Sequence, residues 1–97
     1  MSHDGVKYRC RPNVLHTEMK DVSGVLLDLE SKFYFNLNQT GLTAWKGMNE
    51  AGEDGADLQA LVAALVQSFE VEEEVARADL GDLLDELLAE RLIEAVD

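Results

Sequence analysis

The chain is poor in cysteine, proline, aromatic residues and positive charge. Cys10 is the only cysteine among 97 residues, so no disulfide can form within the chain. Only 8 side chains are Lys or Arg, against 20 Asp and Glu, and the formal net charge is −12. Proteins that bind nucleic acids neutralise phosphates with Lys and Arg, so this balance argues against a nucleic-acid partner.

Long apolar runs are also absent. No segment approaches the roughly 18 apolar residues that a membrane span requires. The polar N-terminus lacks the apolar region of a secretion signal. We therefore expect a soluble, cytoplasmic protein without a membrane partner.

The acidic charge is concentrated in one half of the sequence. Residues 1–50 carry six basic and six acidic side chains, whereas residues 51–97 carry two basic and fourteen acidic ones. A surface of this kind attracts cationic segments. A purely solvated acidic face, which would only keep the protein soluble, is the plainer alternative.

The first half of the sequence predicts strands. Residues 1–12 show no apolar period and are expected to be a flexible segment, so that 13–97 form the single domain. Alternating or short apolar runs at 14–19, 25–29 and 33–37 predict three strands.

The second half predicts three helices. Asn38 and Asp57 are suitable N-caps for the first two, and a third is expected from about Glu72 to Arg91. Leu92 and Ile93 extend the apolar stripe of this third helix. The order of elements predicts an α+β fold in which a three-stranded antiparallel sheet is followed by three helices.

No pattern in the sequence indicates catalysis, a metal or a cofactor. His3, Cys10 and His16 match no zinc spacing, and neither a nucleophile–base signature nor a phosphate-binding glycine loop is present. We therefore expect no enzyme activity, no catalytic residues, no metal ligands and no cofactors.

Peptide binding is the function that remains. A three-stranded sheet has two edges, and an uncovered edge can accept an extended peptide as an added strand. If the third helix lies beside the last strand, Asp79, Asp82 and Glu86 would favour Lys or Arg on such a peptide. Phe33 and Phe35 are expected on the core face of the last strand and Tyr34 on the opposite face.

The segment Val25–Asn38 and its continuation to Trp45 resemble the PqqD family. The family pattern Leu-Asn-x-x-Gly-x-x-x-Trp is found as Leu37, Asn38, Gly41 and Trp45. This resemblance implies a winged-helix-like RiPP recognition element, which binds the leader of a ribosomally made precursor peptide as an extra strand.

Carried onto this sequence, the resemblance places the pairing backbone at Lys32 to Asn36 and one wall of the cleft on the third helix. The peptide-binding residues expected from this placement are Lys32, Phe33, Tyr34, Phe35, Asn36, Val75, Ala78, Asp79, Asp82, Leu83 and Glu86. The family often has a glycine after the third helix, and 89–93 contain none.

Several partners fit this interpretation. The resemblance implies a precursor leader peptide and a maturation enzyme, either a leader peptidase of lasso-peptide biosynthesis or a radical SAM enzyme. A free strand edge can also pair with a second copy, which leaves a homodimer open. The competing hypotheses are a winged-helix DNA-binding regulator, which the acidic third helix disfavours, and a general protein-interaction subunit.

Overall fold

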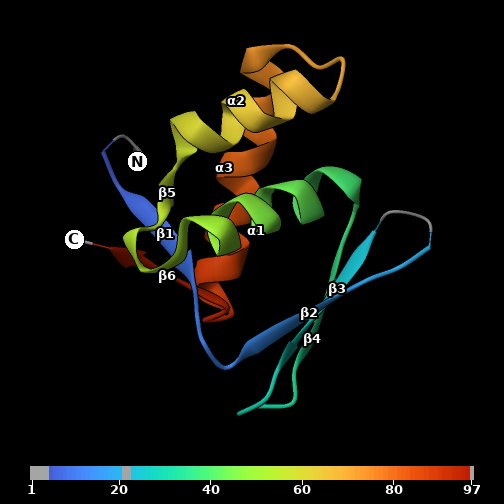
Figure 1. Ribbon diagram of the computed structural model, residues 1–97, viewed down its shortest axis with the longest axis vertical. Coiled ribbons are helices and arrows are strands. Elements are labelled where there is room, and N and C mark those ends of the chain that lie inside the picture. Colours follow the sequence, from blue (N-terminus) through green and yellow to red (C-terminus); the bar gives the residue numbers. More distant parts are fainter. Residues whose placement is uncertain (1–4, 21–22, 97) are drawn as a thin grey trace.

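The computed structural model describes residues 5–20 and 23–96. Within these residues the chain forms two small antiparallel sheets and three helices (Figure 1). The strands are β1 (Lys7–Cys10), β2 (Val14–Glu18), β3 (Gly24–Asp28), β4 (Tyr34–Leu37), β5 (Ala56–Asp57) and β6 (Ile93–Val96). The helices are α1 (Gln39–Ala51), α2 (Leu58–Ser68) and α3 (Glu73–Ala89), with a short 3-10 turn η1 (Gly52–Asp54).

The first sheet is the one that the sequence predicts. Its strand order is β2-β3-β4, and Leu26 of β3 lies between His16 of β2 and Phe35 of β4. Side chains alternate along β3, so Leu26 is fully buried on the face that meets the helices. With the three helices that follow, this sheet confirms the predicted α+β, winged-helix-like class.

The second sheet was not predicted from the sequence, and its strand β1 lies in the segment 1–12 that was expected to be flexible. Its order is β5-β1-β6, and β1 pairs with β6 from the far end of the chain. Tyr8 is only 3% exposed, and Arg9 Nε donates a 2.7 Å hydrogen bond to the Glu94 carboxylate. The prediction that residues 1–12 form a flexible segment is therefore wrong for residues 7–10. His3, which was considered as a metal ligand, lies outside the described residues.

Two of the three helices begin at the predicted caps. Asn38 Oδ1 accepts the Gly41 N–H at 2.8 Å at the start of α1. Asp57 Oδ1 accepts the Ala60 N–H at 2.9 Å at the start of α2. Each bond satisfies a backbone donor that has no partner inside the helix, which fixes where the helix starts.

The third helix ends in a turn that normally favours glycine. Arg91 has a φ of 60°, its N–H bonds to the Leu88 carbonyl, and the Leu92 N–H bonds to the Leu87 carbonyl. This is the Schellman pattern, with arginine in the left-handed position. The chain then turns into β6, so Ile93 begins a strand instead of extending the helix.

The core lies between the helices and the inner face of the β2-β3-β4 sheet. Trp45 and Met48 of α1 are almost fully buried there, as are Leu80, Leu84 and Leu87 of α3. Among the helices of the described residues, none combines the length and the apolar character needed to cross a bilayer.

Candidate functional site

The outer edge of β4 offers main-chain groups for pairing. On one side β4 pairs with β3, and in the described part of the chain no strand pairs with its other side. The Asp28 N–H bonds to the Phe33 carbonyl at 2.9 Å, which marks a hydrogen-bonded pair. Such pairs alternate along an antiparallel ladder, so Tyr34 and Asn36 direct their N–H and C=O groups away from β3.

Helix α3 runs near this edge, and the surface between the two is hollowed. A central hollow of about 1070 Å³ lies between β4, α3 and the residues 19–20 and 23–24 at the adjoining ends of β2 and β3. A helix-side hollow of about 340 Å³ adjoins it, and a hairpin-end hollow of about 620 Å³ lies where the β3–β4 turn meets the end of α3. We call the free β4 edge with these three hollows the groove.

The α3 wall of the groove is acidic with an apolar centre. Asp79, Asp82 and Glu86 recur at spacings of three and four residues, so they share one face of the helix. Leu83, which is half-buried, lies among them and lines both the central and the helix-side hollows. A guest strand in the groove would meet an apolar contact flanked by negative charge.

Most of the predicted site residues meet in the groove. Phe35 and Asn36 line the central hollow, and Lys32 and Phe33 line the hairpin-end hollow. Tyr34 belongs to the free edge through its backbone. On α3, Asp79, Asp82, Leu83 and Glu86 line the hollows.

Two α3 positions and one aromatic side chain differ from expectation. Val75 and Ala78 are exposed on α3 but line none of the three hollows. Phe33 was expected in the core, yet it is 38% exposed. It directly follows Lys32, whose left-handed backbone (φ 63°) ends the regular alternation of the strand.

Several groove residues were missed by the sequence analysis. Met19, Lys20 and Val25 line the central hollow from the β2–β3 side, together with Asn38 at the start of α1. Period-two alternation assigns a residue to a face of the sheet, but it does not indicate which strand end lies next to a distant helix. Only the tertiary arrangement brings Met19 and Lys20 to the same hollow as α3.

Asp28 holds the turn that leads into β4. Its Oδ1 accepts hydrogen bonds from Asn13 Nδ2 at 2.7 Å and from the backbone N–H groups of Glu30 and Ser31 at 2.9 and 3.3 Å. Burial alone would raise the pKa of Asp28, but these hydrogen bonds outweigh it and lower that pKa. The ionised carboxylate therefore fixes the hairpin whose second strand is the free edge.

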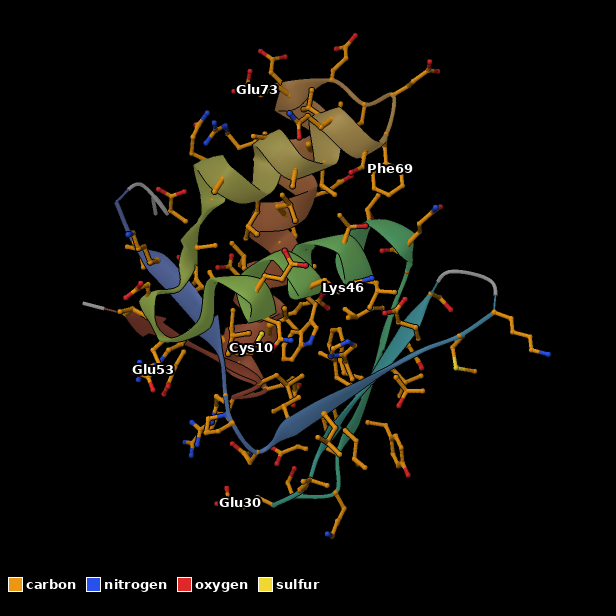
Figure 2. All side chains as sticks on the ribbon, in the orientation of Figure 1. Cys10, Glu30, Lys46, Glu53, Phe69 and Glu73 are labelled. Atoms are coloured by element: carbon orange, nitrogen blue, oxygen red, sulfur yellow. The ribbon has the colours of Figure 1, made fainter. Side chains whose placement is uncertain are left out.

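The lone cysteine has no reactive character. Cys10 Sγ lies 3.7 Å from the Trp45 carbonyl oxygen, and Figure 2 shows it between β1 and α1. Burial raises the pKa of the Cys10 thiol to about 12, so the nucleophilic thiolate is scarce at neutral pH. In residues 5–20 and 23–96, no three His, Cys, Asp or Glu side chains gather closely enough to hold a metal ion.

Comparison with solved structures shows two chains of similar fold. One, described as "TbiB1 in Complex with the TbiA(beta) Leader Peptide", has a TM-score of 0.74 and 26% identity, and the match covers 89% of this chain and 94% of that one. The other, described as "Lasso peptide synthetase B1 complexed with the leader peptide", has a TM-score of 0.69 and 25% identity, covering 94% and 99%.

A family model also matches most of the sequence, whereas no curated protein matches it. The model is that of "Coenzyme PQQ synthesis protein D (PqqD)", and it aligns with residues 23–93. This segment contains β3, β4, all three helices and the motif from Leu37 to Trp45. The chain therefore belongs to the PqqD family, as a PqqD-like RiPP recognition element.

Proposed function

We propose that this chain binds the leader of a ribosomally made precursor peptide as an added strand on β4 and presents it to a maturation enzyme. The observation that carries the proposal is the free β4 edge, where Tyr34 and Asn36 direct main-chain groups toward the groove and no strand within residues 5–20 and 23–96 pairs with them. An extended peptide can satisfy these groups without rearranging the sheet. The chain itself acts as an adaptor and makes or breaks no covalent bond.

The two similar solved structures support a peptide as the guest. Each was determined as a complex with a leader peptide, and each aligns with about nine-tenths of this chain. The family model spans residues 23–93, which include β4 and α3, the two walls of the groove. Strand addition also uses main-chain hydrogen bonds, which fits guests of differing sequence.

Side chains of the groove predict the chemistry of the guest. Phe35 and Leu83 border the central hollow, so an apolar anchor of the leader would fit there. Asp79, Asp82 and Glu86 favour a Lys or Arg next to that anchor. The same charges would repel the phosphates of DNA, which disfavours a winged-helix regulator.

Delivery of the bound leader would raise the effective concentration of the rest of the precursor at the enzyme. Leader peptidases of lasso-peptide maturation and radical SAM enzymes are the two candidate classes of enzyme. The similarity to a lasso peptide synthetase B1 favours the first class, and the family description, which names coenzyme PQQ synthesis, favours the second. A cytoplasmic location, where ribosomes supply the precursor, follows from this role.

Calorimetric titration with the leader encoded beside this chain tests the proposal. We expect saturable binding to the wild type, weakened about tenfold or more by the double substitution Asp79→Lys and Asp82→Lys. The loss should shrink at high salt, because exposed charges are screened. Unchanged circular dichroism would show that the fold survives.

A charge-matched control separates the groove from the overall charge. Glu50→Lys with Glu70→Lys makes the same change in net charge at exposed positions that line none of the three hollows. This variant should bind the leader nearly as the wild type does. Equal weakening by both double variants would contradict the placement of the guest, and absence of binding to the wild type would contradict the function.

A further inference from the structure

The β2-β3-β4 sheet has a second face that is apolar and uncovered. Leu15, Leu27 and Tyr34 are aligned across the three strands, and Thr17, Val25 and Asn36 form the next row. These rows alternate with the buried positions of the same strands, so they lie on the face opposite the helices. We call this surface, with Leu29, the outer face.

No charged side chain belongs to the outer face, and large apolar groups are exposed on it. Leu15 is 53% exposed, Leu29 42% and Tyr34 65%. Figure 1 shows the helices gathered on one side of this sheet, and in the described part of the chain no element covers the other side. An exposed apolar patch of this kind typically marks an interaction surface.

A second copy of the chain does not fit this surface well. The exposed parts of these side chains amount to on the order of a few hundred Å², below the roughly 800 Å² per partner of a stable interface. Each copy also carries a net charge of −12, which opposes self-association. Both observations favour a transient partner of different charge.

We propose that the outer face docks the maturation enzyme, through an apolar patch on the enzyme that is rimmed by basic side chains. This inference rests on the proposed function. Tyr34 connects the two surfaces, because its backbone lies on the groove edge while its side chain lies on the outer face. An enzyme docked there would be adjacent to the bound leader, and the negative charge of this chain would steer its basic rim.

Leu15→Lys tests the proposal, because Leu15 lies on β2 and lines none of the groove hollows. The probes are the synthetic leader and the precursor and maturation enzyme encoded beside this chain. We expect leader affinity within about twofold of the wild type, but processing of the precursor at limiting enzyme slowed about tenfold or more. Val66→Lys, a similarly exposed apolar position on α2 (42%), should change neither quantity.

The outcomes distinguish this proposal from the proposed function. Normal leader binding with slowed processing for Leu15→Lys alone supports docking on the outer face. Normal binding with normal processing overturns it, as does a wild-type dimer in sedimentation that Leu15→Lys dissociates without slowing processing. Failure of the wild type to bind the leader contradicts the proposed function instead.

Discussion

Arg91 occupies a backbone conformation that glycine adopts at lower cost. Its φ of 60° places the β carbon close to the following carbonyl, which costs an L-residue roughly 1–2 kcal/mol. Glycine avoids this cost, but it also makes the unfolded chain more flexible, which offsets part of the increase in stability. Arg91→Gly should therefore raise the free energy of unfolding by about 0.5–1 kcal/mol.

Chemical denaturation measures this change, and Arg91→Ala is the matched control. Alanine also removes the guanidinium but keeps the β carbon, so it should not stabilise the chain. Equal stability of the glycine and alanine variants would contradict the left-handed turn at the end of α3.

Asp28 makes the β3–β4 hairpin sensitive to acid. Its carboxylate accepts three hydrogen bonds, and its folded pKa lies below the ordinary value of 3.8. A lowered pKa contributes stability that is present above the ordinary pKa and is lost as the pH falls through the folded pKa. Asp28→Ala should therefore lower the melting temperature at about pH 7. The difference in melting temperature between this variant and the wild type should become smaller as the pH falls below 3.8.

Thermal unfolding monitored by circular dichroism at several pH values checks this prediction. Glu30→Ala is the matched control, because it removes an exposed carboxylate at the tip of the same hairpin (Figure 2) and keeps the backbone N–H that bonds to Asp28. If the difference in melting temperature between Asp28→Ala and the wild type stayed constant with pH, this would contradict the role assigned to the ionised carboxylate.

Among the elements, β4 should keep its pairing with β3 when a proline is placed on its free edge, but leader binding should weaken. Asn36 directs its N–H away from β3, so Asn36→Pro keeps the β3–β4 ladder while removing one donor for an added strand. Leader affinity should fall about tenfold or more, because a main-chain hydrogen bond is lost and the proline ring crowds the edge. Calorimetry measures the affinity.

The opposite edge of the same sheet supplies the control. The Leu29 N–H bonds to the Asn13 carbonyl, and alternation along the ladder then directs the N–H of His16 away from β3. His16→Pro therefore removes an outward donor from β2 and should leave leader affinity nearly unchanged. Comparable losses at both edges would indicate that the sheet, and not the β4 edge, was disturbed.

The sequence predicts the local elements better than the distant contacts. Asn38 and Asp57 cap helices as expected, since a cap depends on residues within one turn. The β1–β6 pairing joins Lys7 to Val96. Strand β1 does alternate polar Lys7 and Arg9 with apolar Tyr8 and Cys10, a signal that the sequence analysis missed, but four alternating residues do not indicate a partner at the other end of the chain. The α3 wall was only partly predicted, because packing between distant parts of the chain decides which turns of the helix face β4. Asp82 and Leu83 line the hollows as expected.

For the whole molecule, the net negative charge lies mostly outside the β2-β3-β4 sheet. The helices and the second sheet carry almost all of the net negative charge, whereas the β2-β3-β4 sheet carries the free edge and the uncharged outer face. Lys46 of α1 joins the two parts through a 3.1 Å ion pair with Glu18 of β2 (Figure 2). A guest strand and a docked enzyme would therefore use adjoining surfaces of one small sheet.

Strand addition to β4 should be visible in residue-resolved amide hydrogen exchange, measured with and without the leader. Exchange should slow selectively at Tyr34 and Asn36, whose N–H groups gain partners, and change less at Phe35, which is already bonded to β3. Saturating binding of the leader with unchanged exchange at Tyr34 and Asn36 would show that the leader does not pair with β4.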